Sequence, residues 1–215
     1  STLFPYTTLF RSPYSLNDAE GATAALKHLA ALAPEAAITH YLRARIALVQ
    51  RDPVLAASEL QRVLQADPNN VQAQLLLAAA QVSRGSPEQA ESALSRLLAA
   101  HPDNTAARSL LAQVYLSRRE PEAARKLLEA APSQAQPDAF SDWLLGSALL
   151  QSGNKDGLSY LERSANARPQ EPDLRVDLAA AYIAAGDSAK ALQILQELPK
   201  ETAAKPRSQI GRAHV

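Results

Sequence analysis

Apolar residues recur three and four positions apart along most of the chain, which predicts amphipathic helices. Leu75, Ala78, Ala79 and Val82 share one such face. We therefore predict an all-α chain without strands. The expected helices cover residues 18–32, 36–50, 53–66, 70–84, 87–100, 104–118, 121–131, 138–152, 155–167, 171–185 and 188–198.

The turns between these helices have start and stop residues. Asp52-Pro53 places a polar residue before a proline at the first helical position, where the missing N–H costs nothing. Gly85 and Gly186 fall where a helix ends in a left-handed residue. Because Arg51 and Arg119 occupy that same place, mild strain or a different cap is expected there.

Small residues recur at an interval of 34, with one interval of 33. They are Ala22, Ala56, Ala90, Ala124, Gly157 and Ala191. Four positions after each comes a leucine, from Leu26 to Leu195. Twelve positions before comes a second small residue, such as Ala44 before Ala56, and Gly146 fills that place one residue late. Small side chains at fixed places mark points where two helix backbones approach closely, so a larger residue there would force the helices apart.

The repeat divides the chain into helix pairs. A first helix at 18–32 lacks its partner, and the five full pairs are 36–67, 70–101, 104–134, 138–168 and 171–199. Residues 132–137 form the one irregular connection. The expected domain therefore runs from 18 to 199 as an α-α solenoid.

These features resemble the tetratricopeptide repeat, in which Leu-Gly/Ala is followed by an aromatic residue and later by proline. Leu111-Ala112 with Tyr115 fits the pattern, as does Leu178-Ala179 with Tyr182. The tryptophan of the first consensus place is absent, and Trp143 falls one residue later. The resemblance implies a right-handed superhelix with a concave face formed by the first helix of each pair.

Three stretches resemble a narrower group, the tetratricopeptide lipoproteins of PEP-CTERM/exosortase systems in Gram-negative bacteria. They are residues 40–64, 107–129 and 144–187. The resemblance implies a periplasmic or outer-membrane-associated scaffold linked to exopolysaccharide production, with a lipid-acceptor cysteine upstream. A cytoplasmic location is the alternative.

Both ends of the chain look foreign. No methionine occurs anywhere, and residues 2–12 (TLFPYTTLFRS) and 210–215 (IGRAHV) read like translated sequencing adapters. We therefore set aside residues 1–12 and 209–215 as adapter-like artefacts and assign no function to the aromatic residues or to His214 within them.

Composition excludes several classes of protein. The absence of cysteine rules out disulfides, thiolate zinc sites and a cysteine nucleophile in this sequence. The 22 basic residues balance the 22 acidic ones, which argues against a nucleic-acid partner. The longest apolar runs, such as 178–185, are far shorter than the ~20 residues of a membrane span, so no span is expected in this fragment.

Catalytic chemistry is not expected. Outside the adapter-like ends the histidines are His28, His40 and His101, and none has a histidine or glutamate four positions away, as a helical metal pair requires. Glu35, the acid nearest His40, falls off the helix face of that histidine. Neither a glycine-rich phosphate loop nor a nucleophile elbow is present. We predict no enzymatic activity, metal or cofactor.

The sequence instead predicts a protein-interaction scaffold that binds a protein or peptide partner. The candidate concave face comprises Tyr41, Arg45, Gln72, Ser109, Gln113, Phe140, Trp143, Ser147 and Asp173. Phe140 and Trp143 lie three apart on one helix face, either as a groove wall or as core. Arg45 is the one cation at the places that would clamp a C-terminal carboxylate, which excludes that mode. A structural spacer between flanking domains and a glycan-binding module that stacks sugars on Trp143, Phe140 and Tyr41 remain alternatives.

Overall fold

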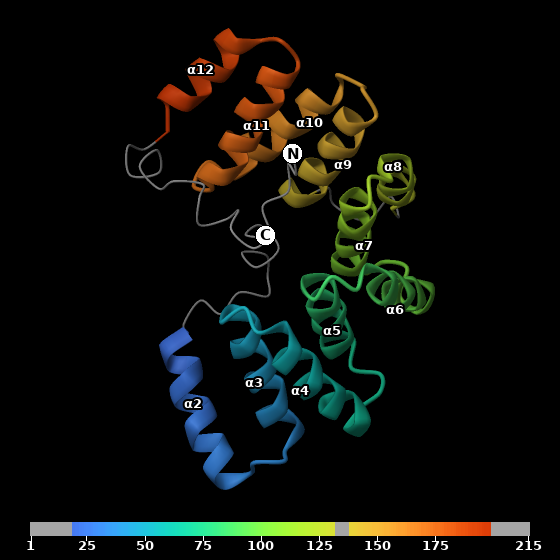
Figure 1. Cartoon of the computed structure of the whole chain (residues 1–215), viewed down its shortest axis with the longest axis vertical. Helices are drawn as coiled ribbons and strands as arrows, with labels where there is room; N and C mark the ends of the chain where they lie inside the picture. Colours follow the sequence, from blue (N-terminus) through green and yellow to red (C-terminus); the bar gives the residue numbers. More distant parts are fainter. Residues whose placement is uncertain (1–18, 132–137, 199–215) are drawn as a thin grey trace. The chain divides into compact units, whose positions relative to one another are not determined.

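The computed structural model describes residues 19–131 and 138–198, and every regular element in those ranges is an α-helix (Figure 1). The helices are α2 (Ala19–Leu32), α3 (Ala37–Val49), α4 (Pro53–Ala66), α5 (Val71–Ser83), α6 (Pro87–Ala100), α7 (Thr105–Ser117), α8 (Pro121–Glu129), α9 (Ala139–Gln151), α10 (Gly157–Ala167), α11 (Pro172–Ala184) and α12 (Ser188–Gln196). Each predicted helix is present, with both ends within two residues of the prediction. The all-α prediction is confirmed.

The structure divides into two compact units, with the boundary between Val114 and Tyr115 inside α7. We call the described residues 19–114 the N-terminal unit and the described residues from 115 to 198 the C-terminal unit. The predicted ends at 1–12 and 209–215, and the irregular connection at 132–137, lie outside the described residues.

In the N-terminal unit, helices that follow one another in sequence pack against one another from α2 to α6. α3 also contacts α5, so first helices of successive pairs meet as well. The core between α3, α4 and α5 contains Ala44, Ala56, Leu60 and Leu76, all fully or almost fully buried. This is the sequential stacking that a helical repeat requires.

The C-terminal unit follows the same rule, with contacts from α8 to α9 and onward in order to α12. Leu144, Ala148, Leu161 and Leu178 form its buried interior. No helix within the described ranges is both long and apolar enough to cross a membrane.

The small residues lie where the 34-residue interval places them. Ala56, Ala90 and Ala124 in the second helices have no exposed surface. Ala44 in the matching column of first helices is also fully buried. A longer side chain at these positions has no free space to enter, which is why alanine recurs there.

Helices α9 and α10 approach closely at Gly146 and Gly157. A methyl group on Gly146 would lie 2.7 Å from the Gly157 carbonyl oxygen and 3.0 Å from Leu161. The opposite carbonyl belongs to the backbone and cannot swing aside as a flexible side chain would. Glycine at both positions therefore allows α9 and α10 to approach closely, and the interval of 33 falls in the same repeat.

The predicted left-handed helix ends are confirmed. Gly85 and Gly186 have φ of 74° and 88°, and Arg51 and Arg119 both have φ of 60°. A side chain with a Cβ at this φ costs about 1 kcal/mol, so the two arginines hold mild strain. At the next helix start, the Leu55 amide donates to Asp52 Oδ1 at 2.9 Å, as expected for a cap.

A candidate side-chain pocket between α9, α10 and α11

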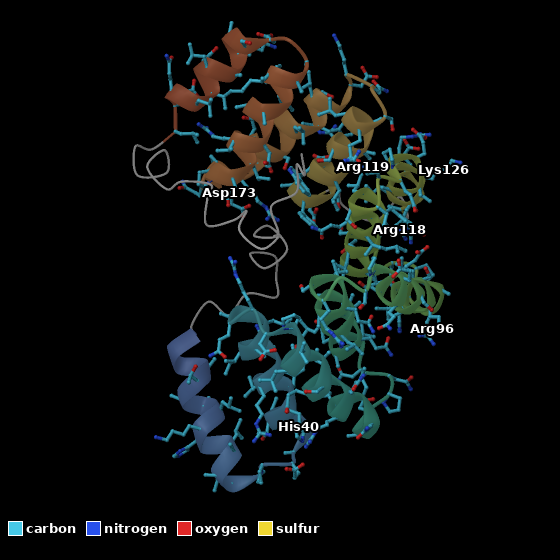
Figure 2. The ribbon with its side chains drawn as sticks, viewed as in Figure 1. His40, Arg96, Arg118, Arg119, Lys126 and Asp173 are labelled. Carbon is cyan, nitrogen blue, oxygen red and sulfur yellow. The ribbon has the colours of Figure 1, made fainter. Side chains whose placement is uncertain are left out.

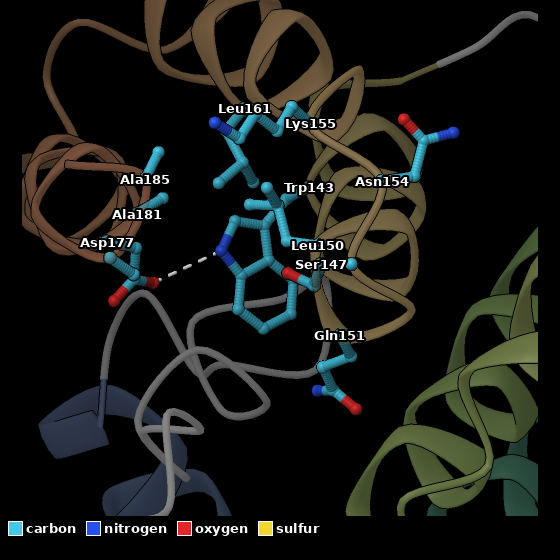
Figure 3. Close-up of a pocket in the computed structure, with 12 residues that line it drawn as sticks. Trp143, Ser147, Leu150, Gln151, Asn154, Lys155, Leu161, Asp177, Ala181 and Ala185 are labelled. Carbon is cyan, nitrogen blue, oxygen red and sulfur yellow. Dashed lines mark hydrogen bonds between the residues drawn. The ribbon is translucent and has the colours of Figure 1, made fainter. Parts of the chain in front are cut away.

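A pocket of about 270 Å³ lies within the C-terminal unit, between α9 and α11 and against α10 (Figure 3). It is smaller than the ~300–1,000 Å³ clefts that take drug-sized ligands, so its size suits a single large side chain. The first helices of two consecutive pairs provide its two walls.

Short side chains open this space. Ser147 on α9 and Ala181, Ala184 and Ala185 at the end of α11 line the pocket. Leu150 and Leu161 also reach it, from α9 and from α10. The lining is therefore mainly apolar, which favours an apolar occupant.

Trp143 closes the inner side of the pocket. Its side chain is only 3% exposed, and its Nε1 donates to Asp177 Oδ2 at 3.1 Å (dashed in Figure 3). Phe140 stacks on the indole with 5.8 Å between ring centroids and an 11° interplanar angle. Since the Trp143 ring is held by a hydrogen bond and by stacking, it forms a rigid part of the wall.

The turn from α9 to α10 supplies the polar edge of the pocket. Gly153 has φ of 82°, and the Asn154 amide donates to the Leu149 carbonyl at 2.9 Å. Asn154 Oδ1 accepts from the Asp156 amide at 2.9 Å. These bonds fix the backbone on both sides of Lys155, whose exposed side chain lines the pocket.

Polar contacts outside the pocket join α10 to its neighbours. Ser164 Oγ donates to the Ala139 carbonyl at 2.6 Å, and the buried Tyr182 hydroxyl donates to Glu162. Burial of Tyr182 raises the pKa of its phenol, and the hydrogen bond to Glu162 raises it further. The hydrogen bond to Tyr182 in turn raises the pKa of Lys190. Helix α10 is therefore joined to α9 by the buried Ser164 bond and to α11 by the partly buried bond between Glu162 and Tyr182.

A second buried polar pair lies in the N-terminal unit, where His40 Nδ1 is 2.7 Å from Glu59 Oε2. His40 Nε2 is also 3.5 Å from Glu35 Oε2, so the prediction that Glu35 falls off the face of His40 was wrong. The error arose because Glu35 precedes α3 and its side chain returns toward His40 from outside the helix. Within the described residues, no group of three or more His, Cys, Asp or Glu side chains could hold a metal ion.

The predicted face residues of the N-terminal unit differ in exposure. Tyr41 and Arg45 on α3 are half-buried, with the Arg45 guanidinium 6.0 Å from the Tyr41 ring centroid. Gln72 on α5 is exposed, whereas Ser109 and Gln113 on α7 are buried.

In the C-terminal unit the structure brings two of the predicted residues, Trp143 and Ser147, to the pocket. Phe140 is half-buried and stacks on Trp143. Asp173, labelled in Figure 2, is half-buried on α11 outside the pocket lining. Sequence reasoning missed Asp177 and Lys155. The repeat register alone does not point to Asp177, because the interval of 33 aligns Trp143 with Val176 and places Asp177 one position later.

Family models of the tetratricopeptide repeat match most of the chain. One matches residues 47–104, 84–141 and 148–214, and a second matches residues 7–71. The chain belongs to the tetratricopeptide repeat family. Proteins of this family act as scaffolds for protein interactions.

Solved structures share the repeat fold. MamA 41-end from Desulfovibrio magneticus RS-1 is 18% identical with a TM-score of 0.62, over 79% of this chain and 97% of that chain. Another MamA crystal structure is 22% identical with a TM-score of 0.57, over 71% and 90%. A monomeric IFIT1 mutant with Gppp-AAAA is 19% identical with a TM-score of 0.71, over 89% and 48%. No curated protein matches the chain.

Proposed function

We propose that this tetratricopeptide repeat chain is a non-catalytic scaffold that binds a protein or peptide segment, and that the pocket between α9 and α11 anchors one side chain of that segment. The observation that carries this proposal is the 270 Å³ apolar hollow between helices of consecutive repeats. The two walls, α9 and α11, both pack against α10, so binding to this preformed pocket requires little ordering of the scaffold.

The membership in the repeat family supports the scaffold role, and the pocket geometry adds a defined place for the partner. Nearly all of the indole of Trp143 is covered, so little ring surface is open for stacking a sugar. That burial weakens the glycan-binding alternative. It favours the spacer alternative, in which Trp143 serves packing alone.

We further propose that the scaffold works in the Gram-negative envelope, in a PEP-CTERM and exopolysaccharide system. The resemblance of residues 40–64, 107–129 and 144–187 supports this setting. The test is the genomic locus. A coding sequence that supplies an export signal and a lipid-acceptor cysteine, next to exosortase genes, would support it. A locus without exosortase or export signal would contradict it.

Peptide selection on the full chain tests the binding role. Displayed peptides would be selected on the immobilised protein, and their affinity measured through the emission of Trp143, the one tryptophan of the sequence. Ala181→Leu should weaken binding by about tenfold or more, because the added side chain fills the pocket. Ala189→Leu is the matched control, on an exposed position of α12 outside the pocket lining.

The spacer alternative makes the opposite prediction. It expects no selected peptide to perturb Trp143 emission, or equal affinity for the parent, Ala181→Leu and Ala189→Leu. Either result would contradict the anchoring role of the pocket.

A further inference from the structure

We propose that the segment bound in this pocket is acidic: it inserts a large apolar side chain and places an aspartate or glutamate beside it, against Lys155. This inference rests on the proposed function and adds the chemistry of the partner.

The apolar part of the partner follows from the inner wall. Leu150, Leu161 and the alanines of α11 offer no polar atom of their side chains. Water in such a space has few partners, so an apolar side chain that displaces it gains free energy. The volume accommodates a side chain of the leucine or phenylalanine class.

The acidic part follows from where the charges lie. Among the described residues that line the pocket, Lys155 is the cation and Asp177 the carboxylate. They come from different elements, the α9–α10 turn and α11 (Figure 3). Asp177 is 9% exposed and accepts the Trp143 Nε1 bond, whereas the Lys155 side chain is exposed.

The positions of Asp177 and Lys155 determine how the partner segment is oriented in the pocket. A partner carboxylate near Asp177 would meet a like charge in a partly desolvated place, where repulsion is strong. At the Lys155 edge the same carboxylate finds an opposite charge. The apolar side chain therefore points toward Trp143, and the acidic neighbour stays at the turn.

Asp156, the acid next to Lys155 in the sequence, does not line the apolar pocket. It lines a separate polar hollow together with Glu122 and Arg125. The bonds of Gly153 and Asn154 hold the turn, so the stem of Lys155 starts from a defined place. A single lysine is a point charge without the fork of an arginine, which suits a flexible acidic side chain.

Three short synthetic peptides test the proposal on the full chain. Each has one central leucine and blocked ends, and the leucine is flanked by aspartates, by serines or by lysines. Binding is read from Trp143 emission at low salt. We expect the aspartate peptide to bind best and the lysine peptide worst, with a ratio of roughly threefold to tenfold, because the rim charge is exposed. The ratio should shrink at about 0.5 M salt.

Two lysine variants identify the charge responsible. Lys155→Glu should reverse the order of the aspartate and lysine peptides. Lys126→Glu changes an exposed lysine on α8 outside the pocket lining and should leave the order unchanged. An unchanged order in Lys155→Glu, or equal reversal by Lys126→Glu, would overturn the proposal.

The outcomes separate this inference from the proposed function. If all three peptides bind with equal affinity, the pocket binds apolar side chains and the acidic preference is wrong. If the three blocked peptides fail and a fourth leucine peptide with a free terminal carboxylate binds, the partner is a chain end and the proposal of an internal acidic segment is wrong. If no peptide alters Trp143 emission, the anchoring role of the pocket fails as well.

Discussion

The indole Nε1 of Trp143 donates a hydrogen bond to Asp177 Oδ2 at 3.1 Å, between residues separated by 34 positions. Trp143 lies on α9 and Asp177 on α11, the first helices of consecutive repeats. Both side chains are buried. The repeat that begins with α9 therefore contacts the repeat that begins with α11 through a hydrogen bond as well as through apolar packing.

Removing the acceptor should reveal what this bond contributes. Asp177→Ala leaves the buried indole N–H without its acceptor, and we expect a loss of about 1–3 kcal/mol in the free energy of unfolding. Denaturant unfolding measures it. Asp103→Ala, in an exposed turn, is the control and should change stability by less than about 0.5 kcal/mol. Equal stability of the two variants would show that the Trp143 bond adds nothing.

Replacing an arginine that has a left-handed backbone conformation should stabilise the protein. Arg119→Gly should raise the free energy of unfolding by up to about 1 kcal/mol, because glycine adopts φ of 60° without strain. Arg84→Gly is the matched control, since Arg84 caps α5 at φ of −82°. There glycine gains nothing and adds entropy to the unfolded chain, so the variant should melt at a lower temperature. A loss of stability in Arg119→Gly would contradict the strain.

Alkaline unfolding should depend on Tyr182. Burial and the hydrogen bond to Glu162 raise the pKa of this phenol above its ordinary value of 10.0, and the hydrogen bond with Tyr182 raises the pKa of Lys190. A group whose pKa is raised by folding stabilises the protein below its unfolded pKa, and that contribution is lost as pH rises through the folded pKa. Stability of the parent should therefore fall above about pH 10.

Tyr182→Phe lacks the titrating phenol, so its free energy of unfolding should fall less steeply with pH in that range. The comparison uses the slope with pH, because the variant also loses the Glu162 bond at every pH. Identical slopes for the parent and Tyr182→Phe would refute the assignment.

The glycine contact between α9 and α10 predicts an unusual sensitivity to one methyl group. Gly146→Ala should destabilise the protein by about 1–3 kcal/mol, because the new Cβ overlaps the Gly157 carbonyl. Gly153→Ala provides the contrast. Nothing lies within 4 Å of its added Cβ, so its cost is limited to the backbone term of about 1 kcal/mol. A smaller loss in Gly146→Ala than in Gly153→Ala would contradict the close approach.

Local spacing sufficed to predict the helices. The period of the apolar residues, the prolines after Asp52 and Ser86, and the left-handed places at Gly85 and Arg119 are properties of neighbouring residues. They depend on backbone and helix-face chemistry that operates within one or two turns. The small-residue columns then indicated where helices cross, and the buried alanines agree with them.

Residue spacing could not predict which side chains pair between different helices. His40 meets Glu59 from the next helix, and Lys155 reaches the pocket from a turn. Such meetings depend on the rotation of each helix about its axis and on rotamers, which a spacing rule does not determine. The same holds for Trp143 and Asp177, which form a hydrogen bond although they lie one position out of register across the interval of 33.

The comparison of Ala90→Leu with Ser95→Leu tests the central claim most directly. Ala90 has no exposed surface at a helix crossing of α6, whereas Ser95 is exposed on the same helix. Thermal unfolding should show Ala90→Leu destabilised by about 1–3 kcal/mol through overpacking. Ser95→Leu should stay within about 0.5 kcal/mol of the parent. Equal melting temperatures for the two variants would contradict the account of helices stacked through small residues.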